Sequence, residues 1–287
     1  MCEVKALACH LPQEYGQPLS RFSRADLQRL VVERGLVAQI SGATIWRWLH
    51  EDALRPWTLR SWVLPQAPDF AAKAGVVLDL YHRLWQDVPL GPDDYVLSAD
   101  EKTQLQIRER LHPTQAPGPS RPIGVDDRYR RHGTCAYLAA WDVHFGRLFG
   151  QVMERSTMVA FDAFVARVMA LEPYRSARRV FWVVDNGTVH RWARACQRLQ
   201  AQWPQLTLVH LPVHASWLNQ IEIYFSVLQR KALTPDDFAT REALEERIMG
   251  FQEHYQQVAE PFTWHYTRND LHELLARCDQ DRLKKAA

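Results

Sequence analysis

Three acidic residues in this 287-residue chain have the types and positions that metal-dependent phosphoryl transfer requires. Asp100 follows the apolar run YVLSA and Asp185 follows FWVV, and such runs are typical of buried parallel strands. If the two strands are parallel neighbours, both carboxylates lie at the same sheet edge, where α/β proteins place their sites. Glu222 lies beside the apolar stripe of a predicted helix, and it joins them if that helix packs across the edge.

Such a group of acids predicts a site for Mg²⁺ or Mn²⁺. Three converging carboxylates are unfavourable unless a cation neutralises them, and hard oxygen ligands suit these two ions. Two ions about 3.5–4 Å apart would activate a water or a 3′-hydroxyl and stabilise the leaving oxygen. Each acid alone has a simpler interpretation, because an Asp at a strand end more often caps a turn or a helix. The three together, with a DNA-binding module upstream, favour the catalytic interpretation.

The DNA-binding module is predicted near the N-terminus. Three short helices are expected there, at about residues 24–35, 36–40 and 42–52. The first begins with a capping box at Ser23, and the third is capped by Ser41, so the segment has the form of a helix-turn-helix. The polar face of the third helix is expected to contact DNA through Thr44, Arg47 and His50. The alternative is a small helical cap whose polar face meets only water.

Basic residues concentrate in two segments, although the net charge is only +2. Residues 20–60 contain seven arginines, and residues 102–132 contain seven lysines and arginines. This distribution suits a polyanionic partner, although arginine-rich solvated surfaces are common. The second segment includes a long predicted loop over 111–132, and loops of that length are usually functional or disordered. Four of its arginines are expected to hold the DNA backbone: Arg121, Arg128, Arg130 and Arg131.

The remaining composition excludes several classes of protein. No segment approaches the ~20 consecutive apolar residues of a transmembrane helix, and the first residues lack the pattern of a secretory signal. We therefore expect a cytoplasmic, nucleoid-associated protein of a prokaryotic cell with no membrane partner. The five cysteines are scattered without a CxxC pair, so neither a zinc ribbon nor disulfides are expected.

Apolar patterns also predict the elements that must position these groups. Residues 1–19 show no period and are expected to form an arm. Further helices are predicted over 69–86, 158–171, 191–203, 217–231, 241–257 and 269–278. Strands are predicted over 95–99, 134–141, 148–153, 179–184 and 206–211. We expect a helix-turn-helix domain, a connector with a linking helix, a catalytic domain and C-terminal helices packed on it, over 1–60, 61–94, 95–235 and 236–287.

The catalytic blocks of the IS630 branch of the IS630/Tc1/mariner transposase superfamily resemble three segments of this chain: VLSADEKTQLQ, VVDNGTVH and LPVHASWLNQIEIYFSVLQRK. The family's second and third strands are similar to the predicted hairpin RYRRHGTCAYLAAWDVHFGRLFG, and its recognition helix to ISGATIWRWLHEDALRPW. The resemblance covers roughly residues 20–280.

The resemblance implies a ribonuclease H-like α/β fold, in which a mixed five-stranded sheet is flanked by helices, with a small all-α helix-turn-helix domain before it. It also implies a DDE triad of Asp100, Asp185 and Glu222, whose last two members are separated by 36 residues. Members of the family cut transposon ends and join the 3′-hydroxyls into TA target sites, with two Mg²⁺ or Mn²⁺ ions per active site. The implied partners are double-stranded DNA, as terminal inverted repeats and target, and a second copy of the chain in a synaptic homodimer.

Five more residues match the motifs around the triad, and the resemblance implies that they position metal, water or DNA: Asn186, His190, His214, Asn219 and Gln220. For each of the two histidines, a purely structural role is an equal alternative. Relatives commonly carry two helix-turn-helix units, whereas about twenty residues precede the one predicted here. The sequence therefore indicates a shorter variant or a truncated reading frame.

Two other functions remain open at this point. The chain could be a non-catalytic or co-opted DNA-binding protein derived from a transposase and acting through residues 20–60, although all three acids are intact. It could also be a ribonuclease H-like nuclease that shares the metal chemistry but joins no strands.

Overall fold

The chain divides into two compact units, residues 1–63 and 64–287, each with its own apolar core. The structure is a computed structural model that describes residues 1–52, 54–58, 68–185 and 197–286, with side chains up to residue 278. In the described part, no helix is both long and apolar enough to cross a membrane.

The first unit is a small helical domain. Its elements are α1 (Cys2–Ala8), a 3₁₀ turn (Pro12–Tyr15), α2 (Arg24–Glu33) and α3 (Gly42–Glu51). The predicted capping box begins α2, since Ser23 Oγ accepts from Asp26 N–H at 3.2 Å and Asp26 Oδ2 accepts from Ser23 N–H at 2.9 Å. Ser41 caps α3 in the same way by accepting from the backbone N–H of Thr44.

Two predictions for this unit are wrong. Residues 1–19 do not form an arm, because α1 buries Val4 and Leu7 in the core of the unit. Residues 36–40 form a turn instead of a helix: Gly35 adopts a φ of 68° after α2, and the apolar side chains of the turn still pack on the core. The three helices are therefore α1, α2 and α3, and α2, the turn and α3 form the helix-turn-helix.

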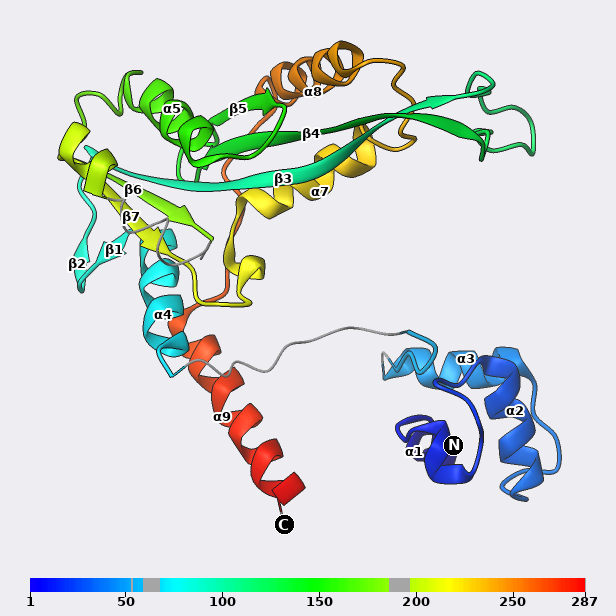
Figure 1. Ribbon diagram of the computed structural model, residues 1–287. Helices are drawn as coiled ribbons and strands as arrows, with labels where there is room; N and C mark the ends of the chain where they lie inside the picture. The colour runs from blue at the N-terminus through cyan, green and yellow to red at the C-terminus, as the bar shows by residue number, and fades with distance from the viewer. Residues whose placement is uncertain (53, 59–67, 186–196, 287) are drawn as a thin grey trace. The chain divides into compact units, whose positions relative to one another are not determined.

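The second unit is built on a mixed five-stranded sheet (Figure 1). Its strands are β3 (Asp94–Arg110), β4 (Tyr129–Asp142), β5 (Leu148–Met153), β6 (Arg179–Val184) and β7 (Leu206–His210). The spatial order is β5-β4-β3-β6-β7, with β3, β6 and β7 parallel and the hairpin β3-β4-β5 antiparallel. This is the strand order of ribonuclease H-like folds, and it confirms the predicted α/β fold with an N-terminal helical unit.

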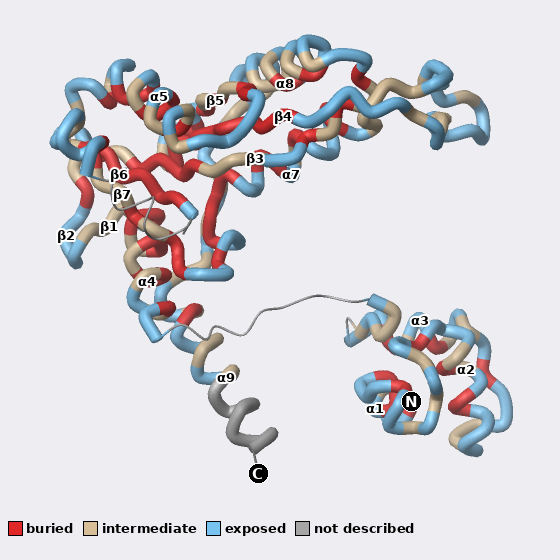
Figure 2. The backbone as a smooth tube through the Cα atoms, viewed as in Figure 1, coloured by how far each residue is buried: buried red, intermediate tan, exposed pale blue. Residues whose placement is uncertain are grey.

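Helices cover both faces of the sheet. Their bounds are α4 (Phe70–Tyr81), α5 (Met158–Met169), α7 (Ile221–Lys231), α8 (Arg241–Gln256) and α9 (Arg268–Ala286). Alternate residues of the central strands point to opposite faces, so that Trp182 packs on the side of α5 and Phe181 on the side of α4, α7 and α8. Figure 2 shows this burial in red along β6 and along the parts of β3 and β4 that lie in the central sheet.

Several boundaries differ from the predicted ones. Helix α4 ends at Tyr81, where a helix to residue 86 was expected. It is followed by a short hairpin of two-residue strands, β1 (Leu84–Trp85) and β2 (Val88–Pro89). A 3₁₀ turn (Ser216–Leu218) precedes α7, and α9 continues well beyond residue 278. Of the helix predicted over 191–203, the structure describes residues 197–202 as helical.

The largest difference is the length of the β3–β4 hairpin. Its strands pair as far as Arg110 and Tyr129, with bulges between Lys102 and Leu105 and between Gln106 and Arg108. We call residues 106–134, the part beyond the central sheet, the arm; Figure 1 shows it projecting from the body of this unit. Residues 236–238 hold its base, where Phe238 N–H donates to Arg108 O at 2.6 Å. Of the loop predicted over 111–132, residues 129–132 belong to β4, whereas residues 111–128 do connect the two strands as a loop, with isolated bridges of Gln115 with Gly124 and of Gly118 with Arg121.

Candidate active site

The sheet brings Asp100 and Asp185 to neighbouring positions. Strands β3 and β6 are parallel, and Ala99 pairs with Val184. Asp100 directly follows Ala99, and Asp185 directly follows Val184. The apolar runs before them are buried because both faces of these strands are covered. Asp100 is half-buried and Asp185 is exposed.

Helix α7 supplies Glu222 in its first turn. The helix packs on the sheet through Ile221, Phe225 and Leu228, and the side chain of Glu222 is exposed beside that stripe. Burial of its carboxyl raises the pKa of Glu222, the positive charge of Lys102 opposes that rise, and the negative charge of Asp185 adds to it. The structure therefore brings the three predicted acids within electrostatic reach of one another.

The electrostatics of Asp100 reflect this crowding. Burial raises the pKa of its carboxyl to about 7, the backbone N–H of Glu101 opposes that rise, and the charges of Glu101, Asp185 and Glu222 add to it. Excess negative charge at one edge of a sheet is the condition that a cation relieves.

Lys102 is a residue of this site that the sequence patterns did not single out. It lies two residues after Asp100 on β3, hence on the same face, and it is half-buried. Burial lowers the pKa of its ammonium, whereas the charge of Glu222 raises it. The strand was predicted to end at Ala99. Had it been predicted to continue through Asp100, Glu101 and Lys102, the alternation of side chains along a strand would have placed Lys102 on the same face as Asp100.

The carboxylates suit a divalent cation by their chemistry. Hard oxygen donors with uncompensated charge are what Mg²⁺ and Mn²⁺ bind, and Asp100, Asp185 and Glu222 would hold such an ion. Within the described part of the chain, no three acidic, histidine or cysteine side chains lie close enough to enclose one ion. The structure thus shows the donor set and its charge, but not a closed coordination shell.

The residues predicted around the triad have different environments. Asn219 is buried, and its Nδ2 donates to Asp100 Oδ2 at 3.1 Å. Gln220 is also buried, and neither polar atom of its side chain has a hydrogen-bond partner among the described residues. His214 is exposed in a turn with a φ of 62°. Asn186 and His190 lie outside the described residues.

The exposed face of α3 differs slightly from the predicted one. Its exposed residues recur at helical spacing and are Ala43, Trp46, Arg47, His50 and, at the C-terminal end, Glu51. Trp46 stacks on His50 with ring centroids 4.7 Å apart, although the indole itself is 41% exposed. Thr44 is half-buried, and its hydroxyl bonds to Ser41 Oγ at 2.9 Å. Of the three predicted contacts, Arg47 and His50 are therefore exposed, and Trp46 is a further exposed residue that was not among them.

The four predicted arginines of the arm are all exposed, and they lie in it as Arg121, Arg128, Arg130 and Arg131. Arg128 forms an ion pair with Asp126 at 3.3 Å, and Arg131 donates to the hydroxyl of Tyr129. Arg130 and Arg131 belong to β4, so they are held on a paired strand and not on a loop as predicted.

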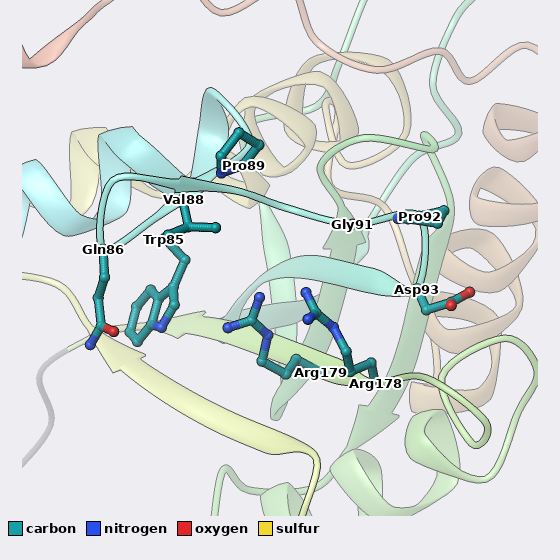
Figure 3. A pocket seen from close by; sticks show the side chains of 9 residues that line it. All are labelled: Trp85, Gln86, Val88, Pro89, Gly91, Pro92, Asp93, Arg178 and Arg179. Atoms are coloured by element: carbon teal, nitrogen blue, oxygen red, sulfur yellow. The ribbon is translucent and has the colours of Figure 1, made fainter.

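A pocket of about 470 Å³ lies away from these acids, near the first residues of β3 and β6. Figure 3 shows the side chains of Arg178 and Arg179 extending toward the segment that carries Val88 and Gly91. Both guanidinium groups bind the buried carboxylate of Asp94, which keeps its pKa well below the usual range against the effect of burial. With Asp93 beside them, the charges balance, and the pocket offers no excess charge to a ligand.

One family model and several solved structures match this chain. A family model described as "DDE superfamily endonuclease" matches residues 95–245, just over half of the chain. The Mos1 mariner paired end complex with Mn is 17% identical over 92% of this chain and 79% of that chain, with a TM-score of 0.49. The Mos1 transposase catalytic domain with Raltegravir and Mg is 11% identical over 75% and 94%, with a TM-score of 0.44. No curated protein matches the chain in sequence.

Proposed function

Because the chain belongs to the DDE superfamily endonucleases, we propose that it is a transposase that cleaves transposon ends and joins the 3′-hydroxyl into target DNA, at TA. The observation that carries the proposal is the parallel pairing of β3 with β6, which puts Asp100 and Asp185 side by side. The proposal also rests on the resemblance of three sequence segments to the catalytic blocks of IS630 transposases.

The three acids would bind two Mg²⁺ or Mn²⁺ ions, which when bound supply Lewis-acid activation of the attacking and leaving oxygens. Both metals appear in the names of the similar Mos1 complexes. Asp100 would provide a carboxylate from the centre of the sheet, and the exposed Asp185 and Glu222 would provide two more. Lys102, beside Glu222, would place a positive charge near the phosphate that is cut.

DNA recognition is assigned to residues 1–60, chiefly to the exposed face of α3, and catalysis to residues 95–235. Residues 61–94 would connect the two, and residues 236–287 would support the catalytic domain. The arginines of the arm would hold the DNA backbone. Since two transposon ends must be brought together before joining, we assign a homodimer to the synaptic complex.

The test is a cleavage and joining assay with the full chain, Mg²⁺ and a plasmid that carries the coding sequence with its natural flanking DNA. We expect excision products and joined products from the wild type. Asp185→Asn should lower both at least a hundredfold while DNA binding in a gel-shift assay is unchanged, because only the charge that holds the metal is removed.

Each alternative has its own outcome in this assay. Cleaved but never joined products would indicate a nuclease. Sequence-specific binding without any cleavage by the wild type would indicate a non-catalytic DNA-binding protein. Normal cleavage by Asp185→Asn would show that the assignment of the triad is wrong.

A further inference from the structure

A buried polar cluster lies between β3 and the start of α7, and it consists of the side chains of Ser98 and Asn219. Ser98 is 0% exposed and Asn219 is 1% exposed, and the apolar cores that surround them include Leu97 and Ala99 on β3 and Leu218 and Ile221 beside Asn219. Buried hydroxyl and amide groups are costly unless they are hydrogen-bonded. The bonds that these two residues make therefore define the geometry at this point.

The direction of each bond follows from the donors available. The backbone N–H of Ile221 can only donate, and it donates to Ser98 Oγ at 3.0 Å. Ser98 therefore donates its own hydroxyl proton, and Asn219 Oδ1 accepts it. With its oxygen held by Ser98, the amide of Asn219 must turn its Nδ2 toward β3, where it donates to Ala99 O and Asp100 Oδ2, both at 3.1 Å.

This arrangement fixes the carboxylate of Asp100. Its Oδ2 accepts from Asn219, and its Oδ1 accepts from the backbone N–H of Glu101 at 2.8 Å. One donor on each oxygen sets the plane of the carboxylate and leaves lone pairs on both oxygens for another partner.

The same cluster fixes the first turn of α7, which carries Glu222. Ile221 N–H is held by Ser98, and Glu222 N–H donates to Asn219 O at 3.1 Å. On the other side, the hydroxyl of Tyr81 on α4 donates to Leu218 O at 2.8 Å, directly before Asn219. The turn that leads into α7 is thus held from both β3 and α4.

We infer that Ser98 is a positioning residue for the catalytic acids: through Asn219 it sets the orientation of Asp100 and the distance between Asp100 and Glu222. The inference rests on the proposed function, since both acids belong to the proposed metal site. Ser98 contacts no reacting atom; it acts by holding the amide of Asn219 in one orientation and the N-terminus of α7 on β3.

The test measures binding of Mn²⁺ alone to the full chain, by electron paramagnetic resonance of the free ion. Ser98→Ala is expected to raise the dissociation constant for Mn²⁺ about 10- to 100-fold, the range found when partners of metal ligands are removed. Asn219→Ala should do the same, and the effects of the two changes should be less than additive in the double variant, because Ser98 acts on Asp100 through Asn219, although it also holds α7 directly through Ile221. Ser98→Cys, which keeps the size and a weak donor, should lie between wild type and Ser98→Ala.

Tyr174→Phe is the matched control, since the buried hydroxyl of Tyr174 donates to Asp142 Oδ2 at 2.7 Å in the same unit, outside the proposed site. It should lower the thermal midpoint and leave Mn²⁺ binding unchanged. If Ser98→Ala and Ser98→Cys behave like this control, or if the double variant is additive, the inference is overturned while the proposed function stands. If the wild type itself binds no Mn²⁺, the proposed function fails and the inference fails with it.

Discussion

At the scale of single residues, Asp100 illustrates a conflict between folding and function. The fold buries an acid next to other acids, which favours its protonated form and raises its pKa to about 7. The groups that face it are Glu101 on its own strand, Asp185 after β6, and Glu222 with the nearby Lys102. Without a cation, the ionised form of Asp100 therefore works against the stability of the folded chain.

This conflict predicts an unusual dependence of stability on pH in the metal-free protein. The unfolded chain loses the proton of Asp100 near its ordinary pKa of 3.8, whereas the folded chain keeps it up to about 7. The free energy of unfolding should therefore fall as the pH rises between these two values. Asp100→Asn removes this contribution and should increase the free energy of unfolding at pH 8 by about 1–3 kcal/mol, with little change near pH 4. Urea unfolding in a chelator at both pH values measures it.

Asp270 offers a control of opposite sign. The hydroxyl and backbone N–H of Thr267 bind its carboxylate at 2.6 and 2.7 Å and lower its pKa. Asp270→Asn should therefore destabilise the protein at neutral pH and have less effect in acid. If Asp100→Asn destabilises the chain in the same way, the carboxylate of Asp100 is not under electrostatic strain.

The sequence predicted these residues to different degrees. Asp100 and Asp185 could be placed together because each ends a continuous apolar run, and this property is local. Ser98 could not be recognised, since its bonds to Ile221 and Asn219 cross more than a hundred residues of sequence. Serine within an apolar run has no periodic signal, and only the packing of α7 on β3 gives it a role.

At the scale of elements, the arm is where sequence patterns failed most clearly. Strand β3 was predicted to end at Ala99, but it continues to Arg110 as a two-stranded ribbon. Apolar alternation marks a strand only where one face is buried, and most of the arm is exposed on both faces. Its base is held by polar contacts instead, such as the ion pair of Arg108 with Asp236 at 2.8 Å.

The second prediction concerns the contribution of the arm to DNA binding. Its four exposed arginines lie on β4 (Arg130 and Arg131) and in the connection before it (Arg121 and Arg128), beyond a fixed base, so they can meet the DNA backbone together. Replacing Arg121, Arg128, Arg130 and Arg131 by alanine should weaken DNA binding and reduce the slope of log affinity against log salt. The expected reduction is roughly 0.9 for each phosphate that the variant no longer neutralises, hence up to about 3–4. Gel-shift or anisotropy titrations of the full chain at several salt concentrations measure this slope.

Two arginines elsewhere in the same unit provide the matched control. Arg175 and Arg198 are also exposed, lie outside the arm, and form ion pairs with Glu172 and Asp162. Their replacement by alanine should leave the salt dependence as it is in the wild type. An unchanged slope in the arm variant would exclude the arm from the DNA interface, whereas an equal reduction in both variants would indicate a non-specific effect of charge.

At the scale of the whole molecule, the important feature is that the apolar cores of the two units share no residues. The core of the first unit consists of residues from α1, α2, α3 and the segments between and after them, whereas residues of the sheet and its helices form the cores of the second. A unit of about 60 residues buries a smaller fraction of its surface than a larger one and is correspondingly marginal in stability. The two units are therefore expected to unfold independently, with the first melting at the lower temperature.

This separation predicts that damage to one core leaves the other function intact. Leu27 and Leu228 are both 0% exposed, in α2 and α7 respectively. Each change to alanine should cost its own unit about 2–5 kcal/mol. Leu27→Ala should abolish the lower calorimetric transition and sequence-specific DNA binding but preserve Mn²⁺ binding, while Leu228→Ala should do the reverse. Arg47→Ala separates folding from recognition, because replacing this exposed residue should weaken DNA binding without moving either transition. A single calorimetric transition that shifts equally in both leucine variants would mean that the chain folds as one cooperative body, and DNA recognition and metal binding would then disappear together.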